Sequence, residues 1–199
     1  MSYQQKRVWI MSHKFLFDAN FHLFLNKIDQ EFSEEIKQKG CPFCGEKLHQ
    51  ADYPRSPLGM PQLFRDLYER RLSFCCEVCR KRTTPPSVRF FGRRWYPAPL
   101  FILISLLTLG INKRRQTQIH RYFGINVSLS TWKRWRQWWE ESFMTKPFWQ
   151  KMNWIVPPLQ RNGPFPRAFL EVFQGKFEEK MFLILRFISP LTIENFKII

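Results

Sequence analysis

Four cysteines form two pairs with the same internal spacing: Cys41 with Cys44, and Cys76 with Cys79. Two intervening residues place both sulfurs of a pair on one side of a tight turn, so both can bind one metal ion. Two such pairs supply the four thiolates of a closed tetrahedral site, which is typical of structural zinc. Such a site has no open coordination position. We therefore expect a zinc ion that stabilises the fold and does not catalyse a reaction.

Cys75 and His49 are the alternative ligands. Cys75 would leave three residues between itself and Cys79, whereas Cys76 repeats the spacing of the first pair. His49 would bind only if a cysteine were displaced. The total of five cysteines is odd, which argues against a disulfide framework and for a reducing compartment. We expect a cytoplasmic, nucleoid-associated protein.

The interval between the two pairs is longer than in the commonest zinc ribbons. It holds 31 residues, 45–75, compared with roughly 15–20. Pro54, Pro57 and Gly59 mark a loop within it, and a short amphipathic helix is expected over 62–70. The sequence therefore predicts a zinc ribbon over 40–96 with an elaborated loop between its two cysteine turns.

Positive charge dominates the chain and is concentrated in one segment. The formal net charge is +16, and residues 80–137 contain 13 lysines and arginines but no aspartate or glutamate. Phosphates on a partner would relieve this one-sided charge, so nucleic acid is the expected ligand. The candidate nucleic-acid-binding residues are Arg80, Lys81, Arg82, Arg89, Arg93, Arg94, Lys113, Arg114, Arg115, Lys133, Arg134, Arg136 and Gln137.

An apolar run over 100–111 is the one candidate for a membrane span. It has 12 residues, whereas a spanning helix needs about 20. We expect instead a buried helix over 100–109 that begins after Pro99 and stops at Gly110, and no membrane association.

Two further helices should follow this buried helix. The first covers 115–123 and ends at Gly124, and Ser128 or Ser130 caps the second, which reaches about Phe143. Three tryptophans and Phe143 fall on one stripe of that last helix, which indicates a core-facing side: Trp132, Trp135, Trp139. Arginine and glutamine on the other side can read guanine and adenine edges, and lysine can contact phosphates.

Helical segments flank these elements. Residues 14–39 place Phe17, Phe21, Phe24, Leu25, Ile28, Phe32 and Ile36 on an apolar face. Asp18, Asp29 and several glutamates lie on the opposite face, and Gly40 ends the helix. After a proline-rich connection, 169–188 forms an apolar segment interrupted by Gly175. Helix is expected there, although 181–188 is equally consistent with a strand.

The turn at Gly124 and the sequence Ser130-Thr131-Trp132-Lys133-Arg134-Trp135 resemble the recognition helix of helix-turn-helix proteins. Together with the cysteine ribbon, residues 41–143 are similar to the N-terminal DNA-binding region of insertion-sequence transposases and their short companion proteins. The resemblance implies double-stranded DNA as the partner, a separate transposase or recombinase subunit, and transposition as the process. The turn after Gly124 is about two residues longer than usual for this motif.

The sequence does not show the residues that the active site of a nuclease or transposase needs. Two-metal phosphoryl transfer needs clustered carboxylates, and the chain has four scattered aspartates, Asp18, Asp29, Asp52 and Asp66. We expect no catalytic centre. A transcriptional regulator of the same fold, a shortened transposase and a zinc-ribbon RNA-binding protein are the alternatives.

The expected fold is mainly α with a small β zinc ribbon. An N-terminal amphipathic helix (1–39) precedes the zinc ribbon (40–96), a three-helix helix-turn-helix module (97–145) and a mostly helical tail (146–199). Binding as an oligomer is compatible with the sequence.

Overall fold

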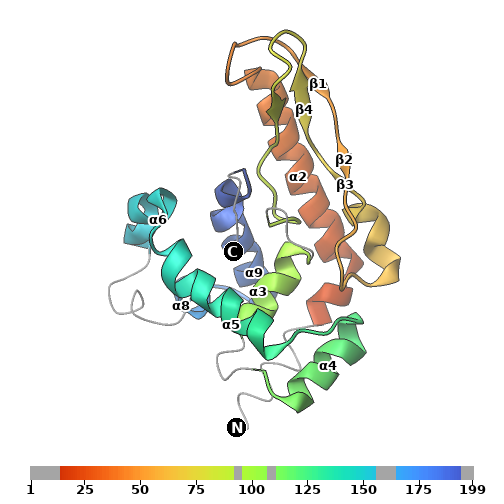
Figure 1. Cartoon of the computed structure of the whole chain (residues 1–199), viewed down its shortest axis with the longest axis vertical. Coiled ribbons are helices and arrows are strands. Elements are labelled where there is room, and N and C mark those ends of the chain that lie inside the picture. Colours follow the sequence, from red (N-terminus) through yellow and green to blue (C-terminus); the bar gives the residue numbers. More distant parts are fainter. Residues whose placement is uncertain (1–13, 92–95, 107–110, 156–164, 194–199) are drawn as a thin grey trace. The chain divides into compact units, whose positions relative to one another are not determined.

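The structure is a computed structural model, and it describes residues 14–91, 96–106, 111–155 and 165–193. These residues are mainly helical, with two small antiparallel sheets (Figure 1). The chain divides into two compact units. The cysteine unit comprises Leu16–Ala98 and Leu185–Lys197, and the helical unit comprises Met1–Phe15, Pro99–Ile184 and Ile198–Ile199. The four predicted segments are thus grouped differently, because the N-terminal helix belongs with the ribbon and the tail is shared.

The N-terminal segment is helical, as its periodicity predicts. A short 3-10 turn, η1 (Lys14–Phe17), precedes α2 (Ala19–Lys39). Asp18 caps α2 by accepting a hydrogen bond from the Asn20 N–H at 3.0 Å. Gly40 ends the helix with φ 76°, and its N–H donates to the carbonyl of Lys37.

The buried face of α2 differs from the predicted one at an apolar residue, Phe24, and at a charged residue, Asp29. Phe21, Leu25 and Ile28 are buried, as expected. Phe24 is 44% exposed, whereas Asp29, which the sequence places on the polar face, is fully buried. A buried carboxylate is stable only with partners that a helical pattern does not reveal.

The partners of Asp29 lie on the segment that follows the ribbon. Its carboxylate accepts hydrogen bonds from the Ser87 hydroxyl at 2.6 Å, the Val88 N–H at 2.8 Å and the Arg89 Nε at 2.8 Å. The Arg89 side chain is 4% exposed and also donates to the carbonyl of Leu67. Arg89 is therefore a structural residue, and a correction to the candidate nucleic-acid contacts, because its charge is compensated inside the fold.

A second buried polar group joins α2 to the loop between the cysteine pairs. The His22 Nε2 lies 2.8 Å from the carbonyl of Leu16, which can only accept, so Nε2 carries the proton. Nδ1 then accepts from the Tyr68 hydroxyl at 2.9 Å. Burial lowers the pKa of His22 and raises the pKa of Tyr68, since it disfavours the charged form of each.

The ribbon strands are short and antiparallel. One sheet has the order β1-β4-β5, from β1 (Leu48–Gln50), β4 (Phe74–Cys76) and β5 (Arg82–Thr83). Leu48 pairs with Cys76, and Phe74 pairs with Thr83. A second sheet pairs β2 (Tyr53–Pro54) with β3 (Arg70–Arg71). The expected helix over 62–70 is a 3-10 helix, η2 (Gln62–Tyr68).

The C-terminal segment is helical where the sequence left a strand open. Its helices are α8 (Arg167–Val172) and α9 (Phe177–Ile188), followed by η5 (Ser189–Thr192). The unit boundary falls within α9. Thr192 belongs to the cysteine unit, where its hydroxyl accepts from the Ser87 N–H at 2.9 Å.

The helical unit contains the rest of the described chain. Its elements are α3 (Ala98–Ser105), α4 (Lys113–Phe123), α5 (Leu129–Gln137), the π-helical η3 (Trp138–Phe143), α6 (Pro147–Met152) and η4 (Asn153–Ile155). The predicted end of the first helix at Gly110 lies outside the described residues. In the part of the chain that the structure describes, no helix has the length and apolarity to cross a membrane.

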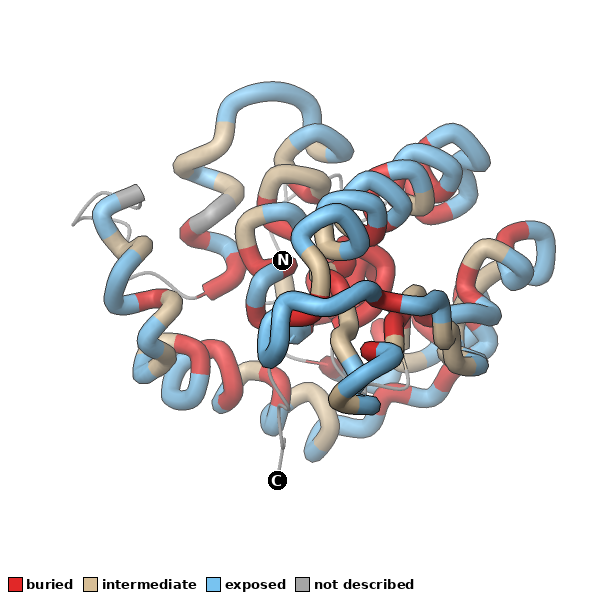
Figure 2. Tube along the Cα trace, turned by 90° about the horizontal axis from the view of Figure 1, so that it is seen from above, coloured by how far each residue is buried: buried red, intermediate tan, exposed pale blue. Residues whose placement is uncertain are grey.

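Aromatic side chains form the core of this unit. The ring of Phe101 lies 5.1 Å from Trp135 and stacks on Trp139 at 5.9 Å, and Trp139 lies 5.1 Å from Phe143. The predicted stripe is thus buried at Trp135, Trp139 and Phe143, while Trp132 is half-buried. Trp138 is also buried; it lies three residues after Trp135, on the same helical face, although the predicted stripe omitted it. Buried and exposed residues alternate along the helices in Figure 2, as expected where one face is packed.

Candidate metal centre

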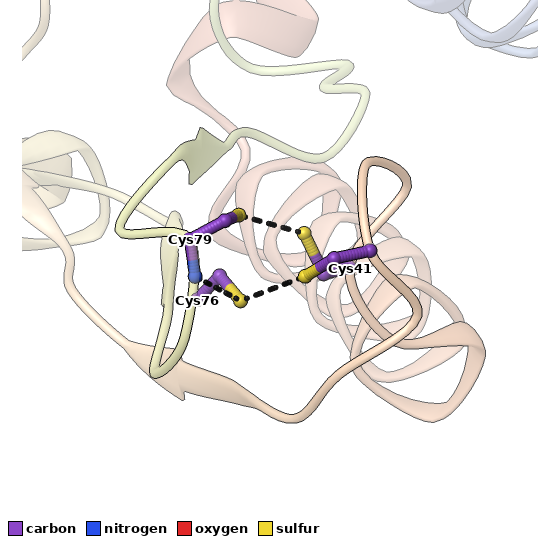
Figure 3. Close-up of side chains that lie close together, drawn as sticks. Cys41, Cys76 and Cys79 are labelled. Carbon is purple, nitrogen blue, oxygen red and sulfur yellow. Dashed lines mark hydrogen bonds between the residues drawn. The ribbon is translucent and has the colours of Figure 1, made fainter.

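The four cysteines of the two pairs come together with their sulfurs facing one another. The Cys41 and Cys79 Sγ atoms are 3.6 Å apart, the Cys44 and Cys76 Sγ atoms are 3.4 Å apart, and all four lie within 4.8 Å of one another (Figure 3). A disulfide would need about 2.05 Å. Tetrahedral bonds of about 2.3 Å from one metal ion separate the sulfurs by roughly 3.8 Å. The cluster can therefore hold a metal ion.

Each cysteine pair is built on the same backbone turn. The Cys41 N–H donates to the carbonyl of Glu46 at 2.8 Å, and the Cys76 N–H donates to the carbonyl of Lys81 at 3.1 Å. Both bonds span five residues. This shared hydrogen bond closes each turn behind its second cysteine and aims both sulfurs to the same side.

The residue after each second cysteine has a left-handed conformation. Gly45 has φ 81°, and Arg80 has φ 57° although it carries a side chain. Gly40 is a further requirement, because a Cβ there would lie 2.6 Å from the Gly45 carbonyl oxygen. The first turn thus needs glycine for close approach at one end and for conformation at the other.

The thiols differ in acidity. Burial raises the pKa of Cys76, but the backbone N–H groups of Cys79 and Val78 stabilise its thiolate and lower the pKa to about 7. The Glu46 N–H favours the Cys44 thiolate, but hydrogen bonds with the other sulfurs, led by Cys76, raise its pKa to about 12. The Cys76 thiol therefore ionises before the Cys44 thiol, and a metal ion must displace the proton from Cys44.

Packing against α2 supports the cluster. Leu48, Phe74, Cys41 and Cys76 form a buried apolar group, and Ile36 near the end of α2 packs against it. The pairing of Leu48 with Cys76 connects the first turn to the second. The fold thus brings together cysteines separated by the 31 residues of the loop.

Neither alternative ligand joins the cluster. Cys75 adjoins Cys76 on a strand, so its side chain leaves the opposite face of the sheet, and its thiol donates to the Arg80 carbonyl at 3.5 Å. His49 Nε2 lies 2.7 Å from the Glu77 carboxylate, an exposed pair that lowers the pKa of Glu77. The four cysteines that come together are Cys41, Cys44, Cys76 and Cys79, the two pairs that the spacing singles out, and they could hold a metal ion.

The candidate nucleic-acid contacts of the cysteine unit have different surroundings. Arg80, Lys81 and Arg82 are exposed beside the second cysteine turn, and Arg82 also donates to the Ala51 carbonyl at 2.5 Å. Arg93 and Arg94 lie outside the described residues.

The candidate contacts of the helical unit also divide into exposed and occupied side chains. Lys113, Arg114, Lys133 and Arg134 are exposed, and Arg115 is buried. The other two bond to acids in the following segment. Arg136 pairs with Glu140 at 2.6 Å, and the Gln137 amide donates to Glu141 at 2.9 Å.

The connection between α4 and α5 is well defined. The N–H of Gly124, with φ 65°, donates to the His120 carbonyl and ends α4. The Ser128 hydroxyl accepts from the Thr131 N–H at 3.0 Å, so Ser128 and not Ser130 is the cap of α5. The Gln116 amide donates to the Val127 carbonyl at 3.2 Å and ties the turn to α4.

One face of α5 is polar and exposed: Ser130, Lys133, Arg134 and Gln137. Their spacing of three and four residues makes a single stripe, away from the buried Trp135. Arg121, which is exposed near the end of α4, was not among the predicted nucleic-acid contacts. It is one of the 13 basic residues of 80–137, and that count was the sequence feature that could have identified it.

Three of the four aspartates have structural roles. Asp18 caps α2, Asp29 is buried with Arg89, and Asp52 accepts hydrogen bonds from the Ser73 N–H and the Gln50 amide.

The chain matches no family model, no curated protein and no solved structure.

Proposed function

We propose that this chain is a zinc-dependent DNA-binding protein in which α4 and α5 act as a helix-turn-helix. The observation that carries the proposal is the exposed polar stripe on α5. It lies in the segment 80–137, which contains 13 lysines and arginines and no aspartate or glutamate. In this arrangement α5 enters the major groove, and α4 packs behind it.

The exposed side chains suit that role. Arg134 has the forked geometry for guanine, Gln137 can pair with adenine after releasing Glu141, and Lys133 can contact a phosphate. Lys113 and Arg114 stand at the start of α4, where no acid among the described residues pairs with them. Arg136 is bonded to Glu140 and to the Phe165 carbonyl, so it is left out of the proposed DNA contacts.

Zinc is the metal that the four cysteines fit best. A set of four thiolates is soft and favours zinc over magnesium or calcium. Once bound, the ion would replace the apolar core that strands of two or three residues cannot build.

Transposition is the process that the resemblance favours, with catalysis supplied by a separate transposase or recombinase subunit. A transcriptional regulator of the same fold is the alternative. Sequencing the DNA that the purified protein retains separates them, because transposition requires inverted repeats of a mobile element and regulation requires promoter sites.

Fluorescence anisotropy with a mixed-sequence duplex tests DNA binding. The double variant K133A/R134A should lose at least tenfold in affinity and reduce the salt slope by about 1 to 2. K151A/K176A removes the same charge from exposed positions elsewhere in the helical unit and should change affinity less than threefold. Equal loss in both double variants, or preference for structured RNA over duplex DNA, would refute the proposal.

A further inference from the structure

The third residue of each cysteine turn is apolar and exposed. Phe43 is 58% exposed and Val78 is 64% exposed, and each directly precedes the second cysteine of its turn. Neither side chain contributes to the apolar group that supports the cluster. Both side chains are therefore available at the surface to a ligand that approaches the cysteine turns.

Positive charge lies beside the Phe43 ring. The Lys81 ammonium lies 4.4 Å from the centroid of the Phe43 ring, within the range of a cation–π interaction. Lys47, Arg80 and Arg82 are also exposed nearby in sequence. Of the two exposed acids in the turns, Glu77 is bonded to His49, which leaves Glu46. An aromatic ring among cations is suited to a ligand that carries both flat rings and negative charge.

We propose that Phe43, Val78 and Lys81, here named the knuckle tip, bind an unpaired base of single-stranded nucleic acid. A phenyl ring has no hydrogen-bonding group, so it can recognise a base only by stacking on its face. In a duplex those faces are covered by neighbouring bases, whereas a single strand presents them. Lys81 keeps its charge beside the ring and neutralises the adjoining phosphate.

The knuckle tip and the α5 stripe then take different forms of the same polymer. The inference rests on the proposed function in that nucleic acid is the ligand of both. A protein that binds duplex DNA through α5 and an unpaired base through the cysteine unit is suited to DNA with a strand end or an opened pair.

Affinity measurements on the full chain with two probes separate the two sites. The probes are a blunt duplex and a fluorescent oligo-dT. F43L keeps an apolar side chain but removes the π face, and it should lose about tenfold in affinity for oligo-dT while binding the duplex as the wild type does. F43W should restore oligo-dT binding. K81Q should reduce the salt slope for oligo-dT by about 0.7.

The controls guard against damage to the metal centre and against a failure of the other site. F43L must retain the metal content of the wild type, and L63A tests the loss of another exposed apolar side chain, which is 82% exposed. K133A/R134A should weaken duplex binding alone. Wild-type affinity of F43L for oligo-dT, or an equal loss for both probes, overturns the knuckle tip without touching the α5 proposal.

Discussion

The two units are stabilised in different ways. In the helical unit, Trp139 and Phe143 are completely buried, and the Trp139 ring packs on the rings of both Phe143 and Phe101. The ribbon end of the cysteine unit has strands of two or three residues and a small apolar group in which Cys41 and Cys76 are themselves members. The comparison teaches that a side-chain core holds one unit, whereas the ribbon has only a small apolar group beside four sulfurs that could hold an ion.

Removal of the metal should therefore unfold the ribbon and leave the helical unit folded. A strong chelator should abolish hydrogen-exchange protection in β1, β4 and β5 and leave α5 and η3 protected. The loss is the largest expected effect, since structural zinc contributes about 10–16 kcal/mol of binding free energy. C44S should reproduce it without chelator, and C75S should not, because Cys75 lies outside the cluster. Loss of protection in both units together would show that they are not independent.

A cavity in the aromatic core should give the opposite pattern. W139A removes a fully buried indole and should lower the free energy of unfolding of the helical unit by about 3–5 kcal/mol, with an unchanged metal content. W154A is the matched control, because Trp154 is 69% exposed and its loss should cost within about 0.5 kcal/mol. Denaturant titration with metal analysis measures both quantities. Metal loss in W139A would contradict the separation.

Two glycines of the first cysteine turn sharpen the account of the ribbon. G45A places a Cβ in open space at φ 81°, so it should cost about 1 kcal/mol from conformation alone. G40A adds a contact of 2.6 Å with the Gly45 carbonyl and should cost about 2–3 kcal/mol. Competition with a zinc-binding dye measures the difference as metal affinity. Equal costs would mean that the close approach at Gly40 is not required.

The smallest expected effect is a pH dependence confined to the cysteine unit. Burial lowers the pKa of His22 below its model-compound value of 6.5, so the unfolded chain binds a proton before the folded one does. The resulting stability is complete above about pH 6.5 and declines as the pH falls, by at most about 1.4 kcal/mol per pH unit. H22Q removes the contribution of His22 to the pH dependence of stability and leaves the contribution of the cysteine thiolates in place. The difference between wild-type and H22Q unfolding free energies should thus shrink on acidification, and a constant difference would count against the assignment.

Local chemistry made much of this structure predictable. The cysteine spacing identified the four sulfurs that come together, Gly40 and Gly124 identified helix ends, and Ser128 was one of two predicted caps. In each case the cause lies within a few residues of the effect. The tryptophan stripe was predictable for the same reason, since one helix carries it.

Long-range pairing made the remainder unpredictable. Asp29 is buried because Ser87, Val88 and Arg89 return to it from about 60 residues away in the chain, and a helical pattern carries no trace of such a partner. The π-helical turn at Trp138–Phe143 departs from the regular helical repeat on which the prediction relied. The C-terminal segment returns to the cysteine unit in the same long-range way, with the Thr192 hydroxyl accepting from the Ser87 N–H.

X-ray absorption of the purified protein tests the central claim, that four sulfurs hold one structural ion, most directly. The account predicts one zinc ion per chain, surrounded by four sulfur atoms at about 2.3 Å. A nitrogen or oxygen neighbour in the first coordination shell, or a folded ribbon without stoichiometric metal, would contradict it.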